Sequence, residues 1–81
     1  MDDIKLHILS PEGTLVKQDV SLVTLPGVVS PFTVLKDHAA LVTALTEGDI
    51  RYVSAEKEER IHIHEGFVEV KDNQVKVCVE V

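Results

Sequence analysis

The sequence predicts an all-β protein, built as an antiparallel sandwich or barrel of about eight to ten short strands. Two observations predict this fold class. The 81 residues include 14 Val, 5 Ile and 5 Thr, and β-branched side chains pack well on a pleated sheet. Short apolar runs also recur at roughly eight-residue intervals and are separated by turn-forming residues. With only 4 Ala and 1 Met, the chain has little of what favours helices.

The length and charge narrow the possible functions. Residues 1–81 are long enough for one small domain. The 8 basic and 14 acidic residues give a net charge of −6, and no basic stripe of the kind that nucleic acid requires is present. No apolar run approaches the roughly 18 residues of a membrane span, so direct membrane insertion is not expected. A single cysteine, Cys78, fits a reducing, cytosolic setting.

At the start of the chain, apolar and polar residues alternate. Ile4, Leu6 and Ile8 are separated by polar residues, which predicts a half-buried strand. Residues 10–13 form a turn that contains Pro and Gly. A second extended run follows to residue 25, with a kink or bulge expected at Asp19, and Pro26-Gly27 ends it. A short strand over 32–35 comes next.

Residues 37–47 are ambiguous by pattern. Asp37 could cap a helix, and Leu41 and Leu45 are four residues apart, as on one helical face. Val42 and Thr43 favour a strand instead. The pattern by itself leaves both structures open.

The remaining sequence predicts strands and short connections. The charged stretch 55–59 is expected to be a solvated hairpin loop, and Gly66 is expected to permit a bulge. Asp72-Asn73 has the character of a two-residue hairpin turn, because Asn tolerates left-handed geometry. The strands expected from here on cover residues 50–54, 60–64, 67–71 and 74–81.

His62 and His64 form the sharpest local motif. Two residues apart on a strand, both imidazoles project from one face and could supply two zinc ligands. A structural zinc site needs three or four protein ligands. Arg60, on the same face, would oppose a metal, and nothing fixes His7 or Glu65 nearby. The sequence therefore favours solvent-facing histidines and predicts no metal site.

No arrangement predicts catalysis or a cofactor. Cys78 shares a face with Lys76, but no base accompanies it, so a packing role under a loop or interface is favoured. Asp37 and His38 are adjacent and have no nucleophile placed with them. The four glycines lie far apart, so there is no phosphate loop. We expect a non-catalytic protein without a cofactor.

One apolar stretch lies outside the strand pattern. Val28, Val29 and Phe32 follow Pro26-Gly27 in a segment that resembles a loop. These side chains either cover the end of the core or form an exposed tip that meets a partner. The residues themselves favour neither alternative.

Several short segments occur in a characteristic order and spacing from Ser10 onward. They are Ser10-Pro11-Glu12-Gly13, Val23-Thr24-Leu25-Pro26-Gly27, His38-Ala39, Leu41-Val42-Thr43-Ala44-Leu45, Gly48, Gly66-Phe67-Val68-Glu69-Val70 and Asn73-x-Val75-x-Val77. In this ordered set the chain resembles the N-terminal domain of the epsilon subunit of rotary F-type ATP synthases. The resemblance implies a flattened antiparallel β-sandwich of about ten short strands in two sheets, with a strand at 41–46.

The resemblance implies a mechanical role. Epsilon is a central-stalk, or rotor, subunit of the proton-translocating enzyme. It links the gamma subunit to the membrane ring of c subunits and so helps to couple proton transport to ATP synthesis. By resemblance, this chain is expected on the cytoplasmic side of a bacterial plasma membrane, as a peripheral part of the complex.

The resemblance also implies partner-facing residues. Ser10, His38 and Thr43 are expected to face gamma. Family members usually carry a Glu-Gly-Glu-Phe-Gly-like stretch in the ring-facing loop, whereas residues 29–33 here are Val-Ser-Pro-Phe-Thr, so a less polar, more rigid contact is expected, with its apolar side chains at least partly exposed. The loop expected to face the c ring comprises Pro26, Gly27, Val28, Val29, Ser30, Pro31, Phe32 and Thr33.

Family members usually continue into a C-terminal helical hairpin, which can brake ATP hydrolysis and in some members binds ATP. This sequence ends at Val81, so neither property is expected of these residues. Two alternative hypotheses are a free-standing β-sandwich binding module, with a weak metal or small-ligand site at His62 and His64, and a small enzyme fragment that uses His38 or Cys78.

Overall fold

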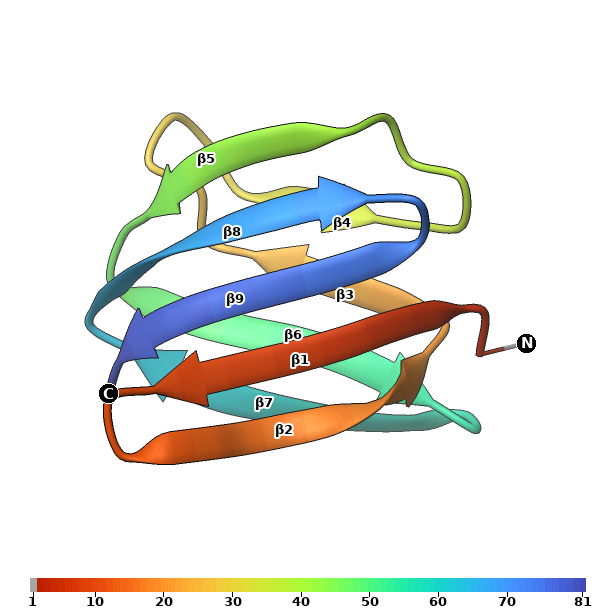
Figure 1. Cartoon of the computed structure of the whole chain (residues 1–81), viewed down its shortest axis with the longest axis horizontal. Coiled ribbons are helices and arrows are strands. Elements are labelled where there is room, and N and C mark those ends of the chain that lie inside the picture. The colour runs from red at the N-terminus through yellow and green to blue at the C-terminus, as the bar shows by residue number, and fades with distance from the viewer. Residues whose placement is uncertain (1) are drawn as a thin grey trace.

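A computed structural model describes residues 2–81 (Figure 1). These residues form nine strands, where about ten were expected, and no helix that is long and apolar enough to cross a membrane. The strands are β1 (Ile4–Ser10), β2 (Gly13–Val20), β3 (Leu22–Leu25), β4 (Phe32–Val34), β5 (Leu41–Leu45), β6 (Gly48–Ser54), β7 (Lys57–Ile63), β8 (Glu65–Lys71) and β9 (Gln74–Glu80).

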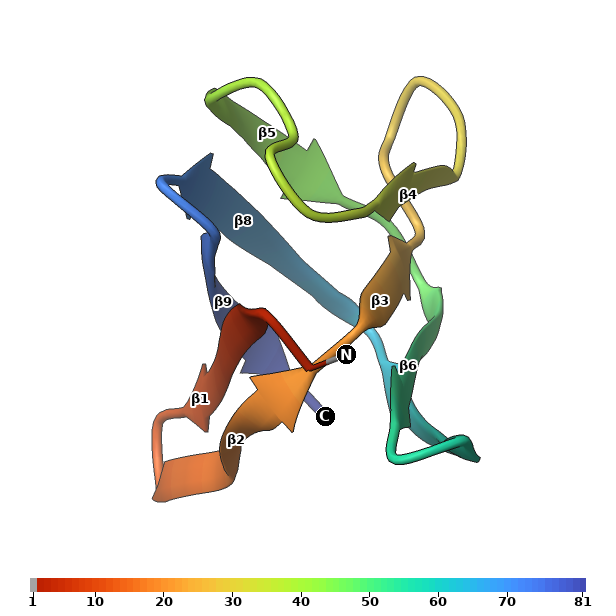
Figure 2. The same cartoon turned by 90° about the vertical axis from the view of Figure 1, so that its right-hand side faces the viewer.

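The strands form two sheets, which Figure 2 shows as two layers. The five-stranded sheet has the order β2-β1-β9-β8-β5, and the four-stranded sheet has the order β4-β3-β6-β7. β1 and β9 are parallel, and the other named pairs are antiparallel. The all-β, two-sheet sandwich expected from the sequence is confirmed.

The core lies between the sheets and follows the alternation of the strands. Over residues 4–8 of β1, 68–70 of β8 and 75–79 of β9, every second residue points inward and is buried, while its neighbours point outward. The buried apolar residues are Ile4, Leu6, Ile8, Val20, Val23, Leu25, Val34, Leu45, Ile50, Tyr52, Ile63, Val68, Val70, Val75, Val77 and Val79.

The ambiguous segment is a strand. Residues 41–45 form β5, which pairs with β8 over its whole length. The helical alternative is therefore wrong, and the strand implied by the family resemblance is confirmed. Leu41 and Leu45 lie on the inner side of β5 because residues an even number apart share one face of a strand.

At the two hairpin turns one expectation is wrong and one is confirmed. The loop predicted at 55–59 is only a two-residue turn, since β7 already begins at Lys57. Ala55 and Glu56 both have positive φ, 51° and 66°, as in the tight turns that match strand twist. The same geometry occurs at Asp72 and Asn73, with φ of 52° and 60°, which confirms the turn predicted there.

Gly66 does not form the expected bulge. The registers of β8 with β5 and with β9 run through Gly66 without a shift. A Cβ at this position would collide with the carbonyl oxygen of Cys78. The glycine therefore permits a close approach of β8 to β9 rather than a change of register.

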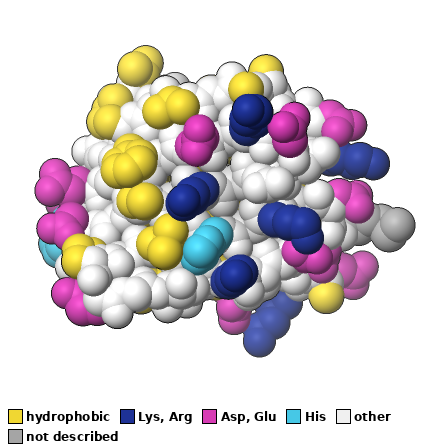
Figure 3. Space-filling model, viewed as in Figure 1, with side chains coloured by type: hydrophobic (Ala, Val, Ile, Leu, Met, Phe, Trp, Pro, Cys, Tyr) yellow, Lys and Arg dark blue, Asp and Glu magenta, His cyan; other side chains and the backbone are white. Residues whose placement is uncertain are grey.

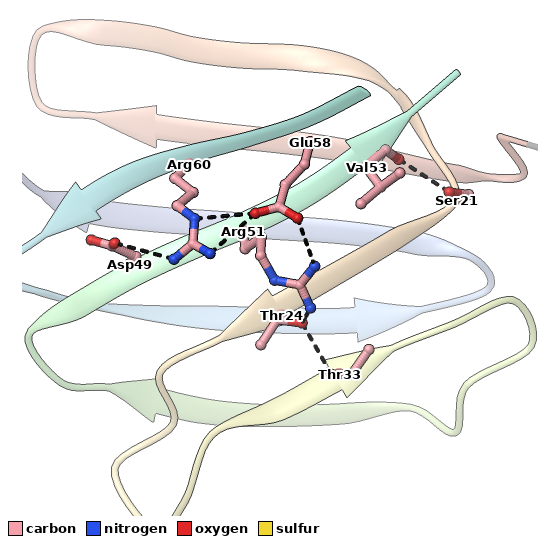
Figure 4. Close-up of polar contacts among 8 residues, drawn as sticks. All are labelled: Ser21, Thr24, Thr33, Asp49, Arg51, Val53, Glu58 and Arg60. Carbon is pink, nitrogen blue, oxygen red and sulfur yellow. Dashed lines mark hydrogen bonds and ion pairs between the residues drawn. The ribbon is translucent and has the colours of Figure 1, made fainter. Parts of the chain in front are cut away.

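The kink or bulge expected at Asp19 is not found at that residue. Two irregularities occur instead, one before Asp19 in the chain and one after it. The register of β1 and β2 shifts between Ile8 and Leu9, which leaves Leu15 as the extra residue of β2. The break between β2 and β3 falls at Ser21. The Ser21 amide and hydroxyl both donate to the carbonyl oxygen of Val53, at 2.8 and 3.2 Å, where the chain passes from one sheet to the other (Figure 4).

Candidate docking surfaces

An apolar row crosses the outer face of the five-stranded sheet. Leu9 of β1 is the register partner of Cys78 of β9, which is the partner of Phe67 of β8, which in turn is the partner of Ala44 of β5. Phe67 is 53% exposed. These four residues, which we call the apolar row, line one shallow groove, and Figure 3 shows apolar side chains gathered on this face. A partner surface could bury them.

The base of the loop at 26–33 is tied to both sheets. Within its sheet of origin, β4 pairs with β3, and the Thr33 and Thr24 hydroxyls lie 3.0 Å apart. Toward the other sheet, the Val28 amide donates to the Ala44 carbonyl at 3.1 Å, and the Thr46 amide donates to the Pro26 carbonyl at 2.8 Å. The loop therefore has a fixed base.

Only part of this loop can meet a partner. Pro26 and Gly27 are buried, and Phe32 is half-buried against the core. A Cβ on Gly27 would approach the Phe32 ring to 3.1 Å, so the loop closes tightly on itself. Residues 28–31 and Thr33 are exposed, with Val29 at 94% and Val28 at 54%. The expected partial exposure of the apolar side chains is confirmed.

The loop tip adjoins the apolar row. Val28 lines the same groove as Leu9 and Phe67, and Ser10 and Pro11 lie at its margin. The exposed tip and the outer face of the sheet are therefore neighbouring surfaces at one end of the molecule.

The connection from β4 to β5 is held by a reciprocal pair of hydrogen bonds. The Asp37 amide donates to Oδ1 of Asn73 at 2.6 Å, and Nδ2 of Asn73 donates to Oδ1 of Asp37 at 3.0 Å. Asp37 has a positive φ of 64°. His38, the next residue, donates its amide to the Leu35 carbonyl at 3.1 Å and places Nδ1 2.6 Å from the Ala39 carbonyl. Asn73 therefore fixes the residue that precedes half-buried His38, and local backbone contacts orient His38 itself.

The three residues expected to face gamma are not adjacent. Ser10 lies at the end of β1 beside the apolar row, whereas His38 lies near Asn73, at the other end of the sheet. Thr43 is half-buried and shares a side of β5 with buried Leu45. Its neighbours Val42 and Ala44 face outward and are exposed.

The sequence reasoning missed the apolar row as a surface. Its signal was present in Phe67, which is out of phase with the buried Val68 and Val70, and in Cys78, which was assigned to packing near an interface. Only the register between β8 and β9 shows that these two residues are neighbours on one face.

The outer face of the four-stranded sheet has a different character. Thr33, Thr24, Arg51 and Arg60 are successive register partners across β4, β3, β6 and β7. Arg51 donates Nη2 to the Thr24 hydroxyl at 3.2 Å and Nη1 to Glu58 at 3.3 Å, and Arg60 donates Nε to the other oxygen of Glu58 at 3.2 Å (Figure 4). One carboxylate thus bridges two opposed guanidinium groups.

The network continues to the two histidines of the motif. Arg60 lies 3.8 Å from Asp49, whose Oδ1 is 2.8 Å from Nδ1 of His62. Oε2 of Glu47 lies 3.2 Å from Nε2 of His62 and 3.8 Å from Nδ1 of His64. The arginines and His62 on this face therefore already have carboxylate partners within the chain.

The histidine motif gains no support as a metal centre. Both ring nitrogens of His62 face carboxylates, and the described residues contain no group of three or more His, Cys, Asp or Glu arranged to hold a metal ion. The hydrogen bonds from His62 to Asp49 and Glu47 instead raise the pKa of its imidazole above the usual 6.5.

Comparisons with known proteins give a consistent result. The sequence profile described as "ATP synthase, Delta/Epsilon chain, beta-sandwich domain" matches residues 3–81. Among curated proteins named "ATP synthase epsilon chain", that of Nitratiruptor sp. is 42% identical over 81 residues, covering 99% of this chain and 63% of the relative. That of Carboxydothermus hydrogenoformans is 41% identical over 76 residues, covering 94% and 57%.

Solved structures share the fold. A chain from the mitochondrial ATP synthase of Euglena gracilis aligns with a TM-score of 0.90 at 21% identity, covering 98% of this chain and 51% of that one. A chain from the central stalk and c-ring structure of the Tetrahymena thermophila mitochondrial enzyme gives 0.83 at 16%, covering 98% and 64%. This chain spans about three fifths of the length of the curated relatives.

A first prediction concerns His62. Because its pKa is raised in the folded chain, its ion pairs stabilise the fold fully below pH 6.5, and this contribution is lost as the pH rises through the folded-state pKa. NMR titration of the imidazole should give a value above 6.5, and Asp49→Asn should lower it. Asp72→Asn, which removes a distant carboxylate, should leave it unchanged. A His62 pKa that does not respond to Asp49→Asn would contradict the pairing.

A second prediction concerns Asp37 and Asn73. Asn73→Asp replaces the donor by a second carboxylate, so the Asp37 amide should exchange its hydrogen faster, as measured by NMR. Adding Asp37→Asn restores one donor and one acceptor in the swapped order, and should restore slow exchange at residue 37. Both residue types tolerate the positive φ. If the double variant exchanges as fast as the single variant, the hydrogen bonds do not hold this connection.

Proposed function

Because this chain belongs to the family of ATP synthase delta and epsilon chains, as their β-sandwich domain, we propose that it is a non-catalytic rotor subunit of a proton-translocating ATP synthase. It links the gamma subunit to the c ring and helps to couple proton transport to ATP synthesis. The match over residues 3–81 carries this proposal. The complex is membrane-associated, and the chain lies on its cytoplasmic side in a bacterium.

We assign the contact with gamma to the outer face of the five-stranded sheet. This face carries the apolar row beside Ser10, with Phe67 and Ala44 exposed and Leu9 and Cys78 half-buried. The outer face of the other sheet has its arginines paired with carboxylates, so it has less to gain from a partner. The roles of His38 and Thr43 toward gamma stay predictions. Thr43 is half-buried, and Val42 and Ala44 on either side of it face outward, so these two residues are the more accessible part of β5 for a partner.

We assign the contact with the c ring to the tip of the loop at 26–33. Val28 to Pro31 and Thr33 are exposed there, whereas Pro26 and Gly27 form the buried base and Phe32 closes it. The tip carries no charge, so its docking should depend little on salt. Its fixed base means that little backbone entropy is lost on docking.

A third prediction tests the gamma contact. Phe67→Asp places a charge in the apolar row while leaving the core residues Val68 and Val70 unchanged. Circular dichroism should show an intact sandwich, and calorimetric titration with purified gamma should show binding weakened about tenfold or more, which corresponds to about 1.4 kcal/mol. Val29→Asp, on the loop tip, is the matched control and should bind gamma normally. Unchanged binding by Phe67→Asp would remove this face from the contact.

A fourth prediction tests the ring contact. Val29 is almost fully exposed, so Val29→Asp should leave the melting temperature of the isolated chain unchanged. In inverted membranes with the assembled enzyme, it should reduce ATP-driven proton pumping per ATP hydrolysed, because a charge is buried at an apolar contact. Val29→Ala removes only methyl groups and should reduce pumping less. Normal pumping by Val29→Asp would refute the assignment of this tip to the ring.

A further inference from the structure

The outer face of the five-stranded sheet has a second feature, which the contact with gamma proposed above does not require. Half of the eight basic residues of this acidic chain lie here: Lys5 on β1, Lys17 on β2, Lys71 on β8 and Lys76 on β9. We call these four residues the lysine surface. Figure 3 shows basic side chains beside the apolar side chains on this face.

The strand registers place the lysine surface in two rows. Lys17 faces His7, and His7 faces Lys76, across β2, β1 and β9. The neighbouring row contains Lys5 and Lys71, both beside Gln74. In each row an uncharged or weakly basic residue, Gln74 or His7, separates the two lysines, so no two lysines are directly opposed.

The lysine surface is only partly neutralised. Lys5 pairs with Asp19 at 3.7 Å, and Glu69 is the register partner of Lys76 without forming an ion pair with it. Among residues 2–81, Lys17, Lys71 and Lys76 make no ion pair, in contrast to Arg51 and Arg60 on the opposite sheet. The positive charge on this face is therefore available to a partner.

The rows have a fixed order along the strands. The row of Lys17 and Lys76 lies two residues from the apolar row, which is about 7 Å. On the other flank of the apolar row, Glu65 faces Glu80. The apolar row itself crosses four strands, or about 14 Å. The lysine side also holds Glu69 and Asp19, but its four lysines outnumber these two carboxylates. One flank of the apolar row is therefore net positive, and the flank at Glu65 and Glu80 is negative.

From this order we infer that the outer face docks an amphipathic segment of its partner subunit, with carboxylates along one flank of an apolar stripe. The apolar stripe covers Leu9, Cys78, Phe67 and Ala44, and the carboxylates lie over the lysine surface. The reversed orientation would bring the carboxylates against Glu65 and Glu80, so the charges fix the direction of docking. This inference rests on the function proposed above and adds the chemistry of the partner.

The test compares two lysines that differ in their sheet. Lys76→Glu should slow association with purified gamma and weaken binding about tenfold at low salt, because charges at the rim of an interface act mainly on the association rate. The loss should shrink to about twofold or less in 0.5 M salt, where screening is strong. Lys57→Glu makes the same charge change on β7 and should alter binding less than about twofold.

The outcomes separate the inference from the proposed function. Equal effects of Lys76→Glu and Lys57→Glu, or a loss that salt does not reduce, would overturn the acidic partner segment. If Phe67→Asp still weakened binding about tenfold or more in that case, the apolar contact with gamma would stand. If the unchanged chain did not bind gamma, the proposed function would fail and this inference would fail with it. Lys76→Gln should fall between the unchanged chain and Lys76→Glu.

Discussion

The register of four neighbouring strands determines both what the core contains and what a partner meets. Because β1, β9, β8 and β5 pair without a shift at residues 9, 78, 67 and 44, the valines and isoleucines between these positions point inward together. The residues out of phase must point outward together, and so they form one row. This register requires glycine at position 66, because any side chain there would collide with the backbone of β9. A displacement of one residue would exchange the two sets.

The outer faces of the two sheets differ in how far their charged side chains are paired. On the four-stranded sheet, Glu58 bridges Arg51 and Arg60, and the chain of contacts runs on to His62. On the five-stranded sheet, Lys17, Lys71 and Lys76 make no ion pair within the described residues and lie near the apolar row. In the proposed role, the chain needs one face that binds a partner and one that does not. The four-stranded sheet, whose arginines are paired with carboxylates, suits the face that does not bind. The five-stranded sheet, with its apolar row and with lysines unpaired among the described residues, suits the face that binds.

Much of the fold was predictable because it depends on local pattern. The alternation of Ile4, Leu6 and Ile8 and the turn at Asp72-Asn73 are properties of neighbouring residues, and both are confirmed. The sequence reasoning failed where tertiary pairing decides. Residues 41–45 are a strand because β8 pairs with them, and Gly66 serves close packing rather than a bulge. The docking surface depends on four segments spread over the chain, so spacing within any one of them could not reveal it.

The same reasoning explains how a small domain can pass on a mechanical load. A loop that pushes on a partner must not yield at its base. Here the base is bonded to both layers, through Thr33 to Thr24 in one sheet and through Val28 to Ala44 in the other. Ala44 is itself a member of the apolar row. The backbone hydrogen bond from Val28 to Ala44 therefore joins the proposed ring contact directly to the proposed gamma contact, which gives a force applied at the tip a short hydrogen-bonded route to the outer face of the sheet.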